Sequence, residues 1–267
     1  LFALTLVILV LARPQTTNKW QNSEIEGIDI MLAVDVSTSM LAEDLKPNRL
    51  EAAKDVAAEF INGRPNDNIG ITLFAGESFT QCPLTVDHAV LLDMIHNIKC
   101  GLIEDGTAVG MGIANAVTRL KDSKAKSKVI ILLTDGTNNK GDISPMTAAE
   151  IAKSFGIRVY TIGVGTNGMA PYPYPVGNTI QYVSMPVEID EKTLTQIAGT
   201  TDGNYFRATS NSKLKEVYEE IDKLEKTKLN VKEYSKRDEE YHWFALAAFL
   251  CVLLEVLLRN SILKKIP

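Results

Sequence analysis

The chain of 267 residues has an apolar content of 45% and a formal net charge of −5, which allows one large hydrophobic core. No basic face or arginine-rich tract stands out, so the composition argues against nucleic-acid binding. Three cysteines are too few for a disulfide scaffold. Cys251 lies in an apolar run, whereas Cys82 and Cys100 are predicted to be free thiols, with a bridge between them left open for an oxidising compartment.

Two apolar runs near the ends of the chain are predicted to be membrane helices. Residues 1–12 carry no charge, and Tyr241–Leu258 carries one, at Glu255. Eighteen helical residues rise about 27 Å, which is close to the ~30 Å of a bilayer core. The first run could be the hydrophobic part of a signal peptide, but Ala12-Arg13-Pro14 is a poor cleavage site. We therefore interpret residues 1–12 as a partial N-terminal transmembrane helix.

Polar segments flank both runs: residues 13–27 form a linker, residues 226–240 a charged connector, and residues 259–267 a basic tail. The positive-inside rule places this tail, with Arg259, Lys264 and Lys265, in the cytoplasm. The domain between the membrane runs is then extracytoplasmic. Basic residues just before the last span argue for the opposite orientation, at Lys232, Lys236 and Arg237. The extracytoplasmic orientation is the one we favour.

Between the linkers, short apolar runs alternate with segments of helical spacing. The predicted strands are Ile28–Val34, Asn68–Ala75, Ser78–Leu84, Val129–Leu133, Arg158–Ile162 and Gly203–Arg207. The predicted helices are Asn48–Ile61, Asp87–Lys99, Ala108–Leu120, Pro145–Phe155, Asp190–Ala198 and Asn211–Leu224. Only Gly76-Glu77 joins the second and third strands, which indicates a hairpin and an antiparallel edge strand. The alternation predicts an α/β domain over residues 28–225: three layers around a doubly wound, mostly parallel six-stranded sheet.

Residues 168–187 interrupt this alternation with three prolines in five positions, which exclude a regular helix. Thr179–Val183 has strand character after a Gly177-Asn178 turn. We predict an inserted hairpin or ordered loop at the carboxyl edge of the sheet. Its tyrosines would suit a contact surface, and a self-packed loop is the alternative; they are Tyr172, Tyr174 and Tyr182.

Polar residues follow the first strand abruptly, at Asp35, Ser37 and Ser39. They stand at the carboxyl edge of a parallel sheet, where such sheets bind ligands. Oxygen ligands of this kind suit a hard divalent cation, although Ser, Thr and Asp after a strand also cap helices without binding a metal. Two further loops supply Thr107, after Gly106, and Asp135, within Thr134-Asp135-Gly136. The sequence therefore predicts a metal site of two carboxylates and three hydroxyls.

At these residues the chain resembles the von Willebrand factor A (VWA) domain. Its metal-ion-dependent adhesion site reads D-x-S-x-S, then T, then D, and all five positions match: Asp35, Ser37, Ser39, Thr107 and Asp135. The resemblance implies strand order 3-2-1-4-5-6 with strand 3 antiparallel. It also implies bound Mg²⁺ (alternatively Mn²⁺ or Ca²⁺) with an open position for an acidic residue of a protein partner. Neighbouring acids are interpreted as solvated loop charges, with tuning of the ion as the alternative: Glu43, Asp44, Glu104, Asp105 and Asp142.

Three catalytic alternatives fit the sequence poorly, so we do not expect an enzyme. An aspartyl-phosphate phosphatase needs a second carboxylate where Ser37 stands. Gly163–Gly168 matches G-x-G-x-x-G but precedes a proline-rich segment and not a helix, so no amide-lined helix start awaits a pyrophosphate. A serine hydrolase would need G-x-S-x-G, and Gly76-Glu77-Ser78-Phe79-Thr80 lacks the second glycine.

Several longer stretches resemble the bacterial aerotolerance (Bat) proteins, especially the BatA branch, among them LAEDLKPNRLEAAK, FAGESFTQCPLT and TDGTNNKGDISP. The resemblance implies a multi-pass protein of the bacterial inner membrane that acts with other Bat-type proteins and a MoxR-type ATPase in stress tolerance. One alternative is a chelatase-like subunit that couples an ATPase to metal insertion or client maturation. The other is a structural envelope protein with a purely stabilising metal.

Overall fold

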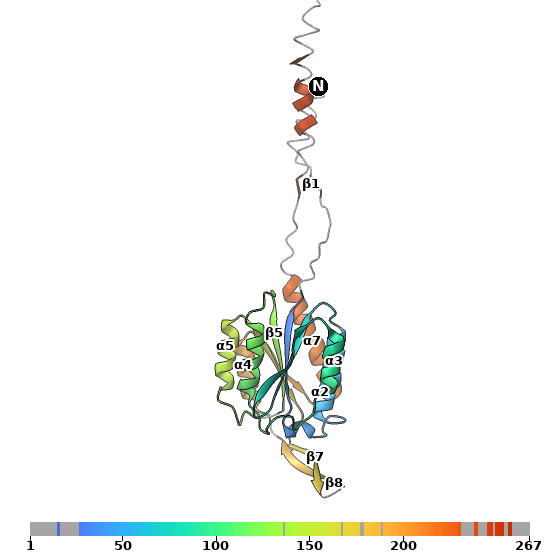
Figure 1. Ribbon diagram of the computed structural model, residues 1–267, viewed down its shortest axis with the longest axis vertical. Coiled ribbons are helices and arrows are strands. Elements are labelled where there is room, and N and C mark those ends of the chain that lie inside the picture. Colours follow the sequence, from blue (N-terminus) through green and yellow to red (C-terminus); the bar gives the residue numbers. More distant parts are fainter. Residues whose placement is uncertain are drawn as a thin grey trace, which may run out of the picture. The chain divides into compact units, whose positions relative to one another are not determined.

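The computed structural model describes residues 15–16, 27–135, 137–166, 168–176, 179–187, 189–230, 238–239, 245–247, 249–253 and 256–257. The chain divides into two compact units. One comprises Ile25–Val231, and the other combines Leu1–Glu24 with Lys232–Pro267. The first unit contains the six-stranded sheet and all the predicted site residues, so it is the functional domain (Figure 1).

The sheet has the order β4-β3-β2-β5-β6-β9. Adjacent strands are parallel except for β4, which pairs antiparallel with β3 at one edge. The strands are β2 (Asp29–Asp35), β3 (Asn68–Phe74), β4 (Ser78–Thr85), β5 (Lys128–Thr134), β6 (Arg158–Val164) and β9 (Tyr205–Ala208). Both the predicted order and the antiparallel edge strand are therefore confirmed.

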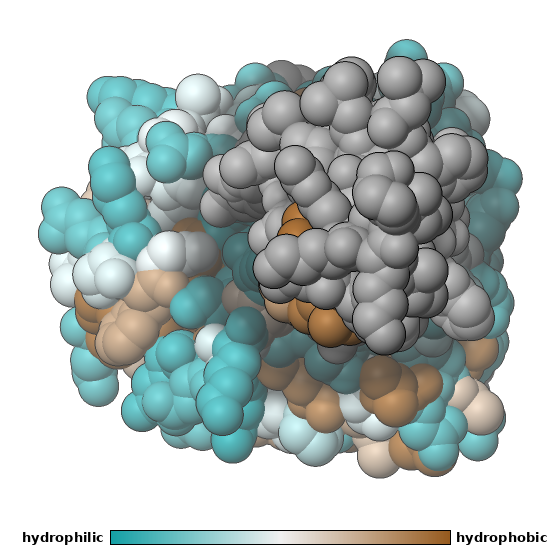
Figure 2. All heavy atoms as spheres, turned by 90° about the horizontal axis from the view of Figure 1, so that it is seen from above, coloured by the Kyte–Doolittle hydropathy of each residue, from teal (hydrophilic) through white to brown (hydrophobic). Residues whose placement is uncertain are grey.

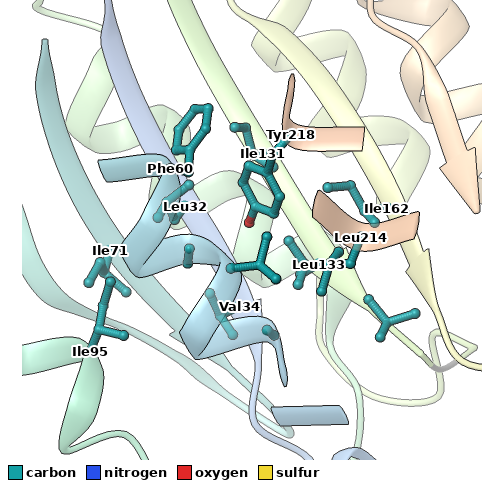
Figure 3. Close-up of a cluster of buried hydrophobic side chains, with 14 of the residues drawn as sticks. Leu32, Val34, Phe60, Ile71, Ile95, Ile131, Leu133, Ile162, Leu214 and Tyr218 are labelled. Atoms are coloured by element: carbon teal, nitrogen blue, oxygen red, sulfur yellow. The ribbon is translucent and has the colours of Figure 1, made fainter. Parts of the chain in front are cut away.

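Helices cover both faces of the sheet, which gives the three predicted layers (Figure 1). One face packs against α2 (Arg49–Asn62), α3 (His88–His96) and α7 (Asn211–Asn230). The other packs against α4 (Val109–Leu120), α5 (Pro145–Ser154) and α6 (Glu191–Thr200). The central strands β2, β3, β5 and β6 are largely apolar because their successive side chains enter different cores, whereas the edge strand β4 mixes polar and apolar residues. In β2, Leu32 and Val34 join the α2–α7 core drawn in Figure 3, whereas Met31 and Ala33 join the opposite one.

Helix starts follow the capping signals in the sequence. The Asn48 side chain accepts a hydrogen bond from the Glu51 N–H at the start of α2. Ser144 caps α5 in the same way, directly before Pro145, and Asp190 caps α6. α7 continues to Asn230 and thus enters the segment interpreted as a connector.

The inserted segment is a hairpin of β7 (Gly168–Val176) and β8 (Thr179–Val187), which together form a separate two-stranded sheet. Of the two predicted alternatives, the hairpin is therefore confirmed over the ordered loop. Figure 1 shows the hairpin projecting beyond the helices at the end of the domain where β2 and β5 finish. It leaves the sheet directly after β6, through a turn at Gly165.

The predicted membrane segments lie largely outside the described residues. All of residues 1–12 lie outside the described part of the chain. Within the second predicted span, residues 241–258, the structure describes three helical pieces: 245–247, 249–253 and 256–257. Among the described residues, no helix is long and apolar enough to cross a membrane. In the second unit, β1 (Gln15–Thr16) pairs antiparallel with β10 (Asp238–Glu239).

The face shown in Figure 2 is mainly hydrophilic where it is described, with separate hydrophobic patches.

Candidate metal site

The site lies where two neighbouring parallel strands of the sheet end. Asp35 is the last residue of β2, and Asp135 directly follows β5, the strand that pairs with β2. After Asp35 the chain forms a short 3-10 helix, η1 (Thr38–Leu41), that carries Ser39. Thr107 stands two residues before α4. Three loops thus meet at the carboxyl edge, as the sequence predicts.

Four of the five predicted ligands form one hydrogen-bonded network. Ser39 Oγ donates to Asp135 Oδ1 at 2.7 Å, and the hydroxyls of Ser37 and Ser39 lie 3.0 Å apart. The Ser37 N–H donates to Asp35 Oδ1 at 2.9 Å. The spacing of alternate residues after β2 therefore turns their oxygens toward Asp135 on the neighbouring strand.

Thr107, the fifth predicted ligand, belongs to the third loop and is nearly buried. Its N–H donates to the side chain of Asn139, and its carbonyl accepts from the Asn139 N–H. Asn139 belongs to the loop that follows Asp135. On its other side, the Thr107 loop holds the η1 segment, because Asp105 accepts from both the N–H and the hydroxyl of Thr38. These bonds fix the Thr107 loop relative to the other two loops.

Asp35 is a fully buried carboxylate whose hydrogen-bond donors are neutral. One oxygen accepts from the Ser37 N–H and the other from the Thr134 hydroxyl, at 2.6 Å. Burial, together with the negative charge of Asp135, raises the pKa of Asp35 to about 7. A buried carboxylate without a cation costs free energy, so this position favours a cationic ligand.

Arg49 supplies a positive charge to the other carboxylate of the site. Its guanidinium is fully buried and donates to Asp135 Oδ2 at 2.5 Å. The remaining donors bind both oxygens of Asp44, at 2.7 and 2.6 Å. Burial would raise the pKa of Asp44, but Arg49 and the Thr166 N–H outweigh it and hold this pKa at about 2. The interpretation of Asp44 as a solvated loop charge is therefore wrong.

The other neighbouring acids differ in their contacts. Asp105 holds Thr38, as described above, and Glu104 pairs with Lys140 at 2.6 Å on the surface. Asp142 is exposed. The thiol of Cys100 donates to the Ser37 carbonyl at 3.4 Å, and both Cys82 and Cys100 are free. The bridge that the sequence left open is absent.

The chemistry of the donor set fits a hard divalent cation. The converging groups are oxygens from two carboxylates and from serine hydroxyls, with no thiolate or imidazole among them. Within the described part of the chain, no group of three or more His, Cys, Asp or Glu offers a rival centre. Three buried carboxylates, at Asp35, Asp44 and Asp135, face the single guanidinium of Arg49, which leaves the cluster short of positive charge.

Arg49, Thr134 and Asn139 contact the predicted ligands, but the sequence did not nominate them. Thr134 belongs to the T-D-G motif around Asp135, and this motif was the sequence feature that could have indicated its role in the site. Arg49 lies on the first turn of α2, and its partner Asp135 is 86 residues away, so only the folded chain brings them together. The rejected G-x-G-x-x-G motif leads from β6 into β7, which agrees with its interpretation as a turn.

This fold and this arrangement of loops define the von Willebrand factor type A domain, and the chain belongs to that family. The family model matches residues 29–220. An uncharacterised protein of Borreliella burgdorferi is 27% identical over 99% of this chain and 78% of its own length. The similarity thus extends beyond the domain itself.

Among solved structures, the chain is similar to Bat proteins of Bacteroides. BatB from Bacteroides thetaiotaomicron is 35% identical with a TM-score of 0.67, over 75% of this chain and all of that one. An aerotolerance-related membrane protein from Bacteroides fragilis is 34% identical with a TM-score of 0.64, over 74% of this chain and all of that one. The resemblance to Bat proteins is confirmed, although the similar structure carries the name BatB and not BatA.

A more distant relative shows the metal site occupied. Proximal thread matrix protein 1 from the mussel byssus has been solved with zinc in its metal-ion-dependent adhesion site motif. It is 25% identical to this chain with a TM-score of 0.59, over 74% of this chain and 45% of that one. That protein thus holds zinc at this motif.

Proposed function

We propose that the domain binds Mg²⁺, or alternatively Mn²⁺ or Ca²⁺, and uses the ion to bind an acidic residue of a protein partner. Asp35, Ser37, Ser39, Thr107 and Asp135 would hold the ion. The ion would supply an electrophilic position that attracts an external carboxylate. The protein acts by binding and not by turnover.

The observation that carries this proposal is the buried and uncompensated charge of Asp35. Its two hydrogen-bond donors are neutral, and the guanidinium of Arg49 bonds to Asp135 and Asp44 instead. A divalent ion beside Asp35 would offset the cost of burying this carboxylate. Serine hydroxyls add no negative charge, so the bound ion would keep a net attraction for an acidic partner.

The similarity to Bat proteins supports a place for this interaction in the bacterial envelope. We propose that the chain is a multi-pass protein of the inner membrane with its domain outside the cytoplasm. Its partners would be other Bat-type proteins and a MoxR-type ATPase, in a complex that serves stress tolerance. The relative from Bacteroides fragilis, described as an aerotolerance-related membrane protein, supports this placement.

Metal titration of the full chain tests the first step. Mg²⁺ at about 100 times its Kd should stabilise the fold by about 2.7 kcal/mol, because it binds the folded chain alone. Asp35→Asn keeps the size of the side chain but removes its charge. This variant should show no heat of Mg²⁺ binding and no stabilisation by the ion. Asp87→Asn, at the start of α3 and outside the site, is the control and should respond like the wild type.

The partner step needs a separate measurement. Bat-type proteins should be captured from envelope extract by the full chain in Mg²⁺, and lost both with chelator and with Asp35→Asn in Mg²⁺. If Bat-type proteins are captured in all three samples although the wild type binds Mg²⁺ normally, the ion does not bridge the partner and only stabilises the domain.

A further inference from the structure

The β7–β8 hairpin is an exposed surface without charge. Residues 168–187 contain no Asp, Glu, Lys, Arg or His, in a chain whose charged content is 23%. Apolar side chains on both of its strands are nevertheless open to solvent: Met169 is 62% exposed, Tyr174 56%, Tyr182 60%, and Val183 and Met185 46% each. Concentrated apolar exposure on a projecting element marks a surface that another molecule covers.

The outer edge of β7 cannot take another strand. Pro171, Pro173 and Pro175 alternate along β7, and the backbone groups of alternate residues point to the same side of a strand. That side faces away from β8, because the Pro171 carbonyl accepts from the Glu43 N–H, outside the hairpin, at 2.9 Å. Three successive outward positions therefore lack a donor, which is how natural proteins block an edge.

The outer edge of β8 has no such block over its central positions. Ile180, Tyr182 and Ser184 stand opposite the three prolines. In an antiparallel pair, residues opposite outward-facing ones also face outward, so their N–H and C=O groups point to the free side of β8. Within the described part of the chain, β7 is the only strand beside β8. No charged side chain on β8 hinders the approach of another strand.

The base of the hairpin adjoins the candidate metal site. Glu43, which bonds to Pro171, follows the η1 segment that carries Ser39. Asp44 accepts from both the N–H and the hydroxyl of Thr166, just before β7. One partner chain can therefore reach both the ion and the hairpin.

We propose that an extended, uncharged segment of the partner protein adds as a third strand to the outer edge of β8. This deepens the proposed function, because the same partner would place its acidic residue on the metal ion. Strand addition combines main-chain hydrogen bonds with side-chain contacts on both faces of the added strand. The exposed Tyr182, Val183 and Met185 supply those contacts.

Two other occupants fit the geometry less well. β2 begins and α7 ends at the amino edge of the sheet, opposite the hairpin, so the hairpin points away from the ends by which the domain joins the rest of the chain (Figure 1). This disfavours insertion into the membrane that would hold those ends. A second copy would bring like charges together, since the chain carries a net charge of −5 and Glu43 and Asp105 flank the site.

A phage-displayed library of random linear peptides, selected on the full chain in Mg²⁺, provides the probe. The selected peptides should contain an uncharged run with alternating apolar residues and, outside that run, an Asp or Glu. When such a synthetic peptide binds, hydrogen exchange at the amides of Tyr182 and Ser184 should slow. A library that yields no hairpin-dependent binder overturns the proposal. So does protection of these amides by phosphatidylglycerol vesicles or by self-association of the chain.

Substitutions at position 182 separate the backbone from the side chain. Tyr182→Pro removes the outward N–H at an edge position that tolerates proline, whereas Tyr182→Ala keeps that N–H and removes the ring. The proline variant should bind the peptide about tenfold more weakly than the alanine variant, the effect of losing one main-chain hydrogen bond of about 1.4 kcal/mol. Pro173→Ala, on the unused edge of β7, is the control and should bind like the wild type. Equal affinity of the two Tyr182 variants overturns the proposal.

Asp35→Asn distinguishes this inference from the proposed function. If peptide binding requires Asp35 but not the Tyr182 N–H, the metal mechanism stands and strand addition fails. If it requires the Tyr182 N–H but not Asp35, strand addition stands and the metal mechanism fails.

Discussion

At the scale of single residues, Arg49 links the candidate metal site to the rest of the domain. It is held by two carboxylates, Asp135 and Asp44, and Asp44 in turn holds Thr166 at the base of the hairpin. Gly165 makes room for it: a Cβ there would lie 2.5 Å from Arg49 Cζ, and its φ of +124° favours glycine. The position of Asp135 therefore depends on a buried side chain outside the metal-binding motif.

Replacing Arg49 with Met should lower the free energy of unfolding by about 3–5 kcal/mol, because two buried carboxylates lose their cation. Urea unfolding of the full chain without metal measures this. Arg119→Met removes an exposed arginine of α4 and is the matched control, with an expected loss below about 1 kcal/mol. Equal losses in the two variants would show that the buried pairs contribute nothing beyond a surface contact.

At the scale of elements, two helical glycines have opposite surroundings. A Cβ on Gly110 in α4 would lie 2.0 Å from the Ile143 carbonyl oxygen, whereas a Cβ on Gly199 in α6 would meet nothing within 4 Å. Gly199→Ala should stabilise the domain by about 0.5–1 kcal/mol, the usual preference of a helix for alanine. Gly110→Ala should destabilise it, because α4 must move away from backbone before α5. Thermal unfolding of the two variants measures both effects. Stabilisation by Gly110→Ala as well would show that the backbone at Ile143 moves aside at little cost.

The elements also show which features a sequence can predict. β2 and β5 are recognisable because each is buried on both faces, so the residues between its two polar ends are all apolar. The five metal-motif residues could be named because the loops that carry them follow predictable elements. The roles of Arg49 and Asp44 could not be predicted, since their bonds connect residues distant in sequence, and a charged residue near a helix start usually faces solvent. The blocked edge of β7 needed the strand register, which proline spacing alone does not supply.

At the scale of the whole domain, the two edges of the sheet have different roles. The carboxyl edge holds the candidate metal site and the hairpin. The amino edge holds a buried cluster in which Glu225 of α7 accepts from Ser127, Arg158 and Tyr160, next to or within β5 and β6. This cluster fastens α7 to the centre of the sheet. Its charge makes part of the stability of the domain depend on pH.

The pKa of Glu225 lies below its ordinary value: burial would raise it, but hydrogen bonds from Arg158, Tyr160 and Ser127 outweigh burial. Because this pKa is lower in the folded chain, the stabilisation is complete above the unfolded value of about 4.3 and is lost as the pH falls through the folded value. Glu225→Gln should therefore cost about 1–3 kcal/mol at neutral pH, and this difference from the wild type should shrink in acid. Urea unfolding across this pH range measures both, with Glu219→Gln on the exposed side of α7 as the control. A difference that stays constant down to strong acid would mean that Glu225 acts through its shape and not through its charge.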